Sequence, residues 1–155
     1  MGKKRITITV AVLAVLLVAG CSVFEAVLQP DLPDNIDTAK KLYFGLDLKG
    51  TERVLQRILA APEGQPESKA EALLMQARIV WKFHRKPEQA KELLRQAEDL
   101  KVKEYEVLTL LSRVERESGE FQKALDTASR TVELAASERQ WVEARSLWAE
   151  AILEQ

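Results

Sequence analysis

Apolar residues recur at helical spacing along the chain from Asp37 onward. Leu74, Ala77 and Val80 lie three positions apart, and the same spacing returns at Leu108, Leu111 and Val114. Positions three or four apart share one face of an α-helix, whereas a half-buried strand would need strict alternation. No alternating apolar run interrupts the pattern, so the sequence predicts an all-α domain.

Glycine and proline indicate where the first helices end. We expect a helix from about Asp37 to Leu48 that stops near Gly50, because glycine suits the left-handed position after a helix. Thr51 would then cap a second helix. This helix ends before residues 61–66, a stretch with two prolines and a glycine that is the clearest break in the domain.

Later helix ends carry more specific signals. Ser68 and Glu71 have the S-x-x-E spacing of a capping box, which predicts the start of a third helix. Pro87 suits the first position of a fourth helix, where no backbone N–H is needed. Gly119 would end a fifth, and residues 137–155 would form a last, solitary helix.

The sequence also repeats itself at a fixed offset. The 34-residue offset maps Ala90 onto Ala124 and places other residues of like class on one another: Leu74 on Leu108, Ala77 on Leu111, Val80 on Val114 and Leu100 on Leu134. A third, partial copy appears when residues 77–81 are laid on residues 144–148, an offset of 67. A period of about 34 residues is that of the tetratricopeptide repeat.

The chain therefore resembles the tetratricopeptide-repeat proteins. The consensus classes large, small, glycine, aromatic and alanine are filled in order by Leu111, Ser112, Gly119, Phe121 and Ala124. The preceding copy matches at Trp81, Ala90, Leu94 and Ala97 and departs from the pattern at Arg78, Arg85 and Pro87. The resemblance implies a short α-α solenoid of antiparallel helix pairs over residues 37–155. Its repeats would span 37–67 (irregular), 71–104 and 105–138, with a capping helix at 138–155.

Three tryptophans lie at helical spacing within this domain. In a stack of helix pairs, aromatic residues at such positions usually pack in the core or between repeats. We therefore expect Trp81, Trp141 and Trp148 to be packing residues rather than a ligand platform.

Residues 1–21 resemble the export signal of a bacterial lipoprotein. Three basic residues at 3–5 precede an uncharged stretch at 6–19, which is shorter than the roughly 20 residues of a membrane span. It runs into Val-Ala-Gly-Cys at 18–21, which matches the lipobox with valine in place of leucine. The resemblance implies a signal peptide at 1–20, cleaved before Cys21, and covalent diacylglycerol and fatty acyl (palmitate) on Cys21. An uncleaved signal anchor with an unmodified cysteine is the alternative.

The anchor would hold the domain at a membrane surface. Ser22 after the cysteine implies sorting to the outer membrane in a two-membrane bacterium, where the protein would face the periplasm. Residues 21–36 contain Pro30 and Pro33 and no sustained period, so we interpret them as a tether.

Composition narrows the classes of partner. The chain has 23 basic and 24 acidic residues, and loss of the three basic residues at 3–5 leaves 20 against 24. This mildly acidic balance argues against nucleic acid as the main partner. Cys21 is the only cysteine, so no internal disulfide is expected.

The resemblance also indicates a candidate partner-binding face, because the first helices of stacked pairs form a concave wall. The positions that it places there are Met75, Ile79, Lys82, Phe83, Thr109, Arg113 and Arg116. The cations would meet a carboxylate or an acidic segment, and the apolar residues would supply adaptable contact. In the competing interpretation these are solvated charges, with Arg113 paired to Glu117 and Arg116 to Glu120 at i,i+4 spacing.

The sequence gives little support for catalysis. It contains no catalytic triad pattern, zinc-protease motif or phosphate-binding loop. His84 is the only histidine, and its place beside Arg85 and Lys86 predicts a role at a helix end rather than in a metal site. We therefore expect a protein that is not an enzyme and that needs no metal or cofactor apart from the lipid on Cys21.

The function predicted from these observations is that of a membrane-anchored adaptor or assembly factor in a cell-envelope complex. Its partners would be envelope proteins. Two alternatives stay open: an accessory subunit that hands a small ligand to a transporter, and a self-associating structural spacer. The second is attractive because an unfinished third repeat would stack on the exposed end of a neighbour.

Overall fold

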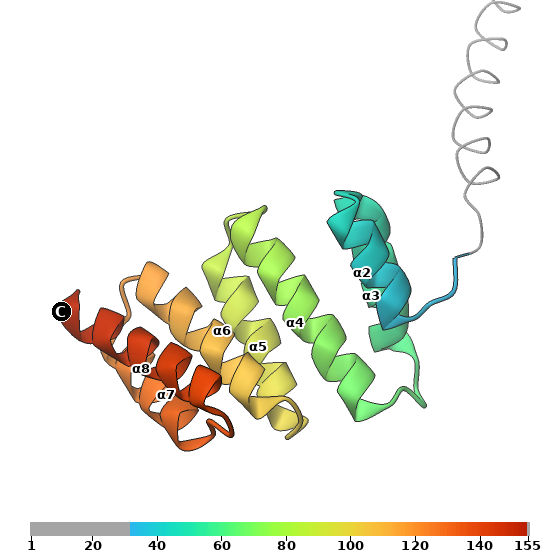
Figure 1. Ribbon diagram of the computed structural model, residues 1–155. Helices are drawn as coiled ribbons and strands as arrows, with labels where there is room; N and C mark the ends of the chain where they lie inside the picture. The colour runs from blue at the N-terminus through green and yellow to red at the C-terminus, as the bar shows by residue number, and fades with distance from the viewer. Residues whose placement is uncertain (1–31, 155) are drawn as a thin grey trace, which may run out of the picture. The chain divides into compact units, whose positions relative to one another are not determined.

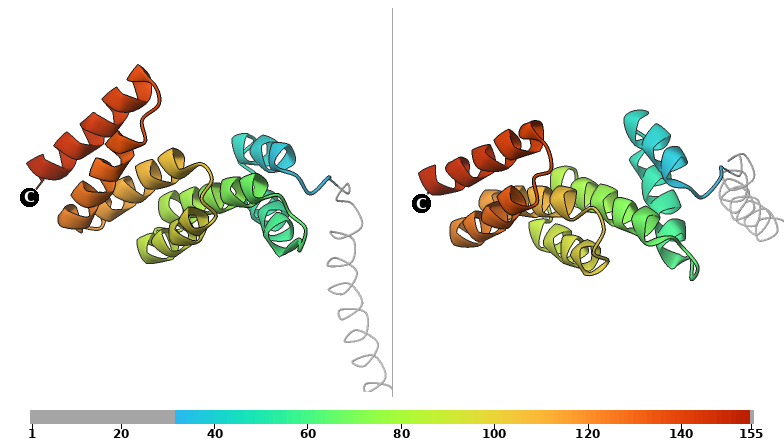
Figure 2. Two further views of the ribbon diagram at one scale, coloured as in Figure 1. Left: turned by 90° about the horizontal axis from the view of Figure 1, so that it is seen from below. Right: turned by 60° about the horizontal axis from the view of Figure 1, so that its bottom comes forward.

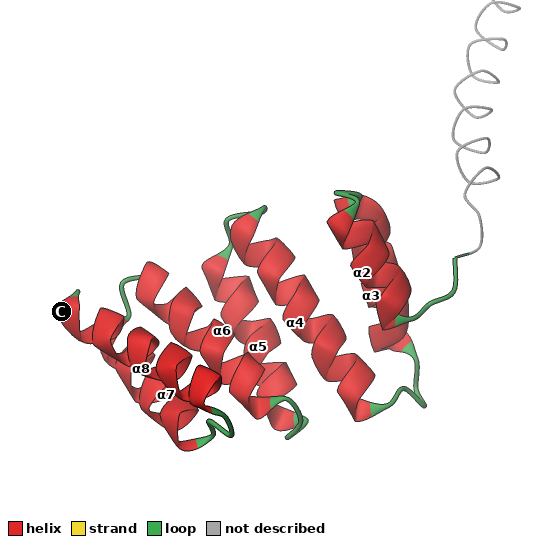
Figure 3. Cartoon of the chain, in the orientation of Figure 1, coloured by secondary structure: helices red, strands yellow, loops and turns green. Residues whose placement is uncertain are grey.

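The computed structural model describes residues 32–154, and within this range it contains only helices and loops (Figure 3). The helical unit spans Asp34–Gln155. Its helices are α2 (Ile36–Phe44), α3 (Leu48–Ala60), α4 (Pro66–Lys82), α5 (Pro87–Asp99), α6 (Glu104–Glu117), α7 (Phe121–Glu133) and α8 (Glu138–Leu153). The all-α prediction is confirmed for these residues. The predicted signal peptide, Cys21 and most of the predicted tether lie outside them.

Helices that are adjacent in the chain pack against each other throughout this unit, from α2 on α3 to α7 on α8. Alternate helices also meet, because α4 contacts α2 and α6, and α6 contacts α8. Two rows result, with α2, α4, α6 and α8 in one and α3, α5 and α7 in the other (Figures 1 and 2). The left view of Figure 2 places the first row on the inner side of a shallow arc. We call the surface of this row the inner face.

Two apolar clusters hold the helices together. The first joins α4, α5 and α6 and includes the completely buried Ala90, Leu94 and Ala97 of α5. The second joins the α2–α3 pair to α4, with Leu55 and Ile79 both at 0% exposure. The alanines of α5 allow close helix approach, and burial of a leucine or isoleucine side chain contributes about 1.5–3 kcal/mol.

The predicted boundary between the first two helices was wrong. α2 ends at Phe44 instead of Leu48, and Gly50 lies inside the first turn of α3. Asp47 caps α3, since its carboxylate accepts a hydrogen bond from the Gly50 N–H at 2.9 Å. Thr51 is not a cap: its hydroxyl donates to the Asp47 carbonyl at 2.7 Å and its side chain is buried. The side-chain cap at Asp47 outweighs the preference of glycine for a helix end.

The capping box at Ser68 and Glu71 is also absent. α4 begins earlier, at Pro66, and Gln65 precedes it without a side-chain cap. Proline is favoured at the first helical position because its missing N–H needs no partner there. Glu71 forms ion pairs with other helices instead.

The remaining helix-end predictions were confirmed. Pro87 is the first residue of α5. α6 ends at Glu117, and Gly119 follows with φ of 78°, the left-handed conformation that suits glycine. Ser137 caps α8 by accepting a hydrogen bond from the Gln140 N–H at 3.3 Å.

The three tryptophans differ in burial. Trp81 is 8% exposed and belongs to the cluster around α5, as expected. Trp148 is half-buried. Trp141 is 48% exposed on α8, so the expectation that it packs in the interior was wrong. No helix covers this side of α8 among residues 32–154.

Candidate functional site

The inner face carries two hollows, one on each side of the middle of the helical row. The first is lined by residues of α2, α4 and the start of α6. The second is lined by residues of α4, α6 and α8. α4 and α6 line both hollows. The third helix is α2 in the first hollow and α8 in the second.

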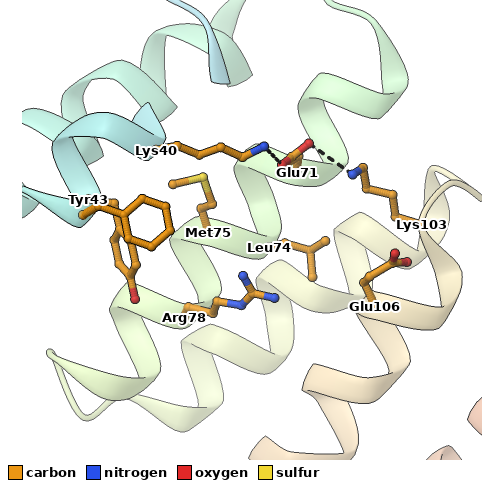
Figure 4. Close-up of a pocket in the computed structure, with 9 residues that line it drawn as sticks. Lys40, Tyr43, Glu71, Leu74, Met75, Arg78, Lys103 and Glu106 are labelled. Carbon is orange, nitrogen blue, oxygen red and sulfur yellow. Dashed lines mark ion pairs between the residues drawn. The ribbon is translucent and has the colours of Figure 1, made fainter. Parts of the chain in front are cut away.

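The first hollow has a volume of about 170 Å³ and an apolar floor. Leu74 and Met75 of α4 form this floor and are 4% and 6% exposed. Tyr43 and Phe44, the last two residues of α2, also line the hollow. Tyr43 is labelled in Figure 4. Phe44 is 80% exposed. A contiguous exposed apolar surface is typical of an interaction site, whereas a single exposed apolar residue is not, so the side chain matters here as part of the hollow.

Charged side chains surround this floor. Glu71 bridges two helices by pairing with Lys40 of α2 at 2.5 Å and with Lys103, next to α6, at 3.1 Å (Figure 4). Burial alone would raise the pKa of Glu71, but its hydrogen bonds to the two lysines outweigh burial and lower the pKa below its ordinary value. Arg78 and Glu106 also line the hollow. The five charged residues carry three positive and two negative charges.

An aromatic contact extends the first hollow toward the end of α4. The ring of Tyr43 meets those of Phe44 and Phe83 edge to face, with centroids 5.7 and 6.3 Å apart. Such pairs contribute about 0.5–1.5 kcal/mol beyond the area that they bury. Phe83 does not line the hollow, and it is 47% exposed, so the aromatic cluster leaves ring surface open to solvent beside Tyr43.

The second hollow is larger, about 510 Å³, but its walls are charged and paired. Arg113 of α6 pairs with Glu143 of α8 at 2.7 Å. Arg116 pairs with Glu150 at 2.9 Å and with Glu154 at 3.2 Å. These pairs draw α8 toward α6 and use the charges that a ligand would otherwise meet.

The remaining cation of this hollow is also engaged. Lys82 pairs with Glu117 of α6 at 3.1 Å, and its ammonium lies 3.4 Å from the ring centroid of Trp81. The cation–π contact and the ion pair hold the side chain across the gap between α4 and α6. The ion pairs around the second hollow therefore hold α4, α6 and α8 together.

The seven residues predicted for the binding face are thus divided by the structure. Met75, Ile79 and Thr109 are buried at 6%, 0% and 8% exposure, and only Met75 lines a hollow. Lys82 and Phe83 are exposed on α4 or just beyond it. The i,i+4 pairs expected as the alternative for Arg113 and Arg116 are not formed, because both arginines pair with α8.

Sequence reasoning missed the residues that make the first hollow distinctive. Lys40, Tyr43, Phe44 and Lys103 were not selected, because the candidate face was taken only from matched repeat positions within 71–138 and residues 37–67 were assigned to an irregular pair. A usable signal was the pair of aromatic residues directly before Gly45, at the end of a helix whose other face is apolar.

Histidine and carboxylate side chains are the remaining candidates for catalysis or metal binding. His84 follows the end of α4, where its backbone N–H donates to the Ile79 carbonyl at 3.2 Å, and its Nε2 lies 2.6 Å from the carboxylate of Glu52 on α3. No cluster of three or more metal-ligating side chains occurs in the described part of the chain. No helix among the described residues is long and apolar enough to cross a membrane.

A buried carboxyl lies between α6 and α7. Burial raises the pKa of Glu115, although its hydrogen bond from the Thr127 hydroxyl at 2.8 Å acts in the opposite direction. It opens onto neither hollow. We interpret it as part of the packing between these helices.

Comparison with known proteins adds no further constraint. No protein-family model, curated protein or solved structure matches the chain.

Proposed function

We propose that this protein is a lipid-anchored adaptor that binds another cell-envelope protein through the first hollow of its inner face and catalyses no reaction. The observation that carries the proposal is an apolar floor beside an 80% exposed phenylalanine, ringed by three cations and two carboxylates. Concave apolar sites with a few polar groups at the rim are the usual form of a recognition site.

The size and charge of the hollow define the partner. A volume of about 170 Å³ accommodates one large apolar side chain and is smaller than the roughly 300–1,000 Å³ of a typical small-molecule site. The excess of positive charge at the rim favours acidic residues beside that anchor. We therefore propose an exposed segment of an envelope protein with one large apolar residue next to acidic residues. The ligand-carrier alternative is less well supported, because the enclosed space is small.

We further propose that the helical unit is a tetratricopeptide-like solenoid. The 34-residue offset relates Leu74 to Leu108 and Ala90 to Ala124, and all four are buried. The alternating rows of helices also support this interpretation. Arg78 is the clearest departure, since it is exposed where the related Ser112 is buried.

The anchor and the location rest on the sequence. We propose that Cys21 carries the lipid and that the domain faces the periplasm from the inner leaflet of the outer membrane. Two acyl chains or more give a stable anchor where one gives a reversible one. Replacement of Cys21 by serine would then prevent both signal cleavage and lipid attachment. Mass spectrometry of the intact protein would detect the retained signal peptide and the loss of the lipid mass. An unchanged mass, apart from the substitution, would establish the uncleaved and unmodified alternative.

Site-specific photocrosslinking tests the binding site. Benzoylphenylalanine is placed at Phe44 in the full chain, in its own cells, and crosslinked proteins are identified by mass spectrometry. The matched control places it at Gln96, an exposed residue of α5 in the outer row. We expect an envelope protein to crosslink at position 44 and not at 96, and Arg78→Glu to reduce the yield. Equal crosslinking at both positions, or none at 44, would refute the first hollow as the binding site.

A further inference from the structure

Helix α8 has three sides with different surroundings. One side is buried by α7 and carries Ala144, Leu147 and Ala151, which are 0%, 4% and 0% exposed. A second side carries Glu143 and Glu150, which pair with the arginines of α6. The third side faces away from both helices.

The third side is largely apolar and exposed. It carries Trp141, Val142 and Ile152 at 48%, 52% and 40% exposure, with Trp148 half-buried beside them. Arg145 lies 5.2 and 5.4 Å from the ring centroids of Trp141 and Trp148.

Most of these residues, together with Glu138, form a regular stripe. Positions 138, 141, 145, 148 and 152 alternate by three and four, which is the a/d spacing of a seam between two packed helices. Glu138 and Arg145 are its two charged members, and both are exposed. We call this stripe the outer face of α8.

The related side of α6 shows what such a face does in this protein. Residues 77–81 align with 111–115 at the offset of 34 and with 144–148 at the offset of 67. Through these two offsets, Arg145 corresponds to Ser112 and Trp148 to Glu115. Both contact α7, since Ser112 donates to the Ala124 carbonyl at 2.9 Å and Glu115 accepts from the Thr127 hydroxyl at 2.8 Å. Residues at these positions of α6 are thus covered by a helix, whereas no helix among residues 32–154 covers the outer face of α8.

We propose that a second copy of this chain covers that face, with the two α8 helices packed antiparallel around a two-fold axis. The charges of the stripe favour this occupant. Neither Glu138 nor Arg145 forms an ion pair within residues 32–154, whereas Glu143, Glu150 and Glu154 on the second side are all paired with α6. The stripe therefore presents one free charge of each sign, two helical turns apart, as a self-complementary surface requires.

The antiparallel arrangement satisfies both charges at once. A crossing midway between Glu138 and Trp148 packs Trp141 of each copy against Arg145 of the other, and it brings Glu138 within reach of the same arginine. A parallel arrangement would instead place Glu138 on Glu138 and Arg145 on Arg145. Opposed helix dipoles favour the same choice. A two-fold contact uses one patch on both copies and closes at a dimer.

The first experiment detects homodimers in cells. Two copies of the full chain with different epitope tags are co-expressed, each with benzoylphenylalanine at Trp141, and irradiated cells are tested for a crosslinked species that carries both tags. The control places the same residue at Gln96 of α5. We expect the doubly tagged dimer at position 141 and not at 96. Absence of that dimer, or a crosslink at 141 to a different protein only, would overturn the proposal.

Charge exchange tests the register. Glu138→Arg and Arg145→Glu, each present in both copies, should reduce the crosslinked dimer by about fivefold to tenfold, because each brings like charges together across the axis. Co-expression of one copy with Glu138→Arg and one with Arg145→Glu should restore the doubly tagged species, since every contact then joins opposite charges.

Two outcomes of this exchange contradict the antiparallel arrangement. In a parallel pair the same mixture would also join opposite charges, at position 138 and at position 145. Either variant mixed with the unsubstituted chain would then join opposite charges at its substituted position as well. Equal restoration by the unsubstituted chain would therefore refute the antiparallel register. No restoration by either mixture would refute the charge contact. Circular dichroism melting of each variant checks that the fold is retained.

The same variants separate this inference from the proposed adaptor function. Arg145→Glu should leave crosslinking of the envelope partner at Phe44 unchanged, and Arg78→Glu should leave the homodimer unchanged. Loss of both adducts in one variant would mean that the two surfaces are not independent.

Discussion

The first hollow keeps an apolar floor open to solvent, whereas the second is bridged by ion pairs between α6 and α8. Both are made by the same row of helices, and α4 and α6 contribute to each. The two hollows differ in the third helix that lines each of them, which is α2 in the first and α8 in the second. α2 adds Tyr43 and Phe44, and α8 adds Glu143 and Glu150. The concave helical face is thus either left open or bridged by ion pairs, according to the residues that its outer helix contributes.

This comparison changes the role of the predicted cations. Arg113 and Arg116 were expected to meet a partner, yet each has a carboxylate of α8 at 2.7–2.9 Å. Binding an acidic ligand there would require breaking these pairs. Arg78, on the first hollow, has no ion-pair partner among residues 32–154. It is therefore the better candidate for contact with an acidic segment.

The largest expected effect on stability comes from shortening an apolar residue that lines each hollow, Leu74 in the first and Leu147 in the second. Leu74→Ala should lower the free energy of unfolding by about 3–5 kcal/mol, because Leu74 belongs to the cluster that joins three helices and cannot collapse into the space left. Leu147→Ala should cost about 2–3 kcal/mol, since α8 is packed on one side and can relax. Urea unfolding followed by circular dichroism measures both. Equal losses would mean that α8 is held as rigidly as α4.

A smaller effect is expected from the ion pairs. Arg116→Ala should lower the free energy of unfolding by about 0.5–1 kcal/mol, because a partly buried arginine loses two carboxylate partners. Arg78→Ala, on the first hollow, should change it by less than about 0.5 kcal/mol. The same denaturation assay at low and high salt provides the check, since only the Arg116 effect should shrink with salt. A salt-independent loss at Arg116 would point to lost packing instead.

The sequence predicted local features better than tertiary ones. Pro87 and Gly119 were placed correctly, because the missing N–H of proline and the left-handed φ of glycine act within one turn of the chain. The break at 61–66 follows from the same kind of signal. The 34-residue offset likewise related residues that are buried in both copies, except for Leu100 and Leu134, of which Leu134 is 39% exposed.

Errors arose where a longer-range or competing contact decided the outcome. Gly50 suggested a helix end, but the Asp47 carboxylate caps the start of α3 just before it. Glu71 has capping-box spacing, yet Lys40 and Lys103 hold it from neighbouring helices. The pairing of the α6 arginines could not be foreseen, because it depends on how α8 lies against α6. The first hollow was missed because the candidate positions came from the two repeats within 71–138, whereas its aromatic wall lies on α2, in the irregular first pair.

The smallest effect concerns Glu71, whose removal should weaken the fold and strengthen binding. Because the folded-state pKa of Glu71 is lowered from 4.5, the carboxylate contributes stability above that pH and loses it as the pH falls through the folded value. Glu71→Gln should therefore reduce the free energy of unfolding by less than about 0.5 kcal/mol at pH 7. The difference from the unsubstituted protein should shrink as the pH falls below 4.5 and vanish once the pH is below the folded-state pKa of Glu71. Denaturation at several pH values measures it.

The same substitution should act on the first hollow in the opposite sense. Without the Glu71 charge, Lys40 and Lys103 lose their shared partner and the rim changes from three positive and two negative charges to three and one. An acidic segment should then crosslink at Phe44 about threefold more efficiently. The matched change in the second hollow, Glu143→Gln, frees Arg113 but should leave crosslinking at Phe44 unchanged, because Glu143 lines the second hollow and not the first. If Glu143→Gln raised crosslinking at Phe44 as much as Glu71→Gln, the net charge of the domain, and not the charge at the rim of the first hollow, would govern binding.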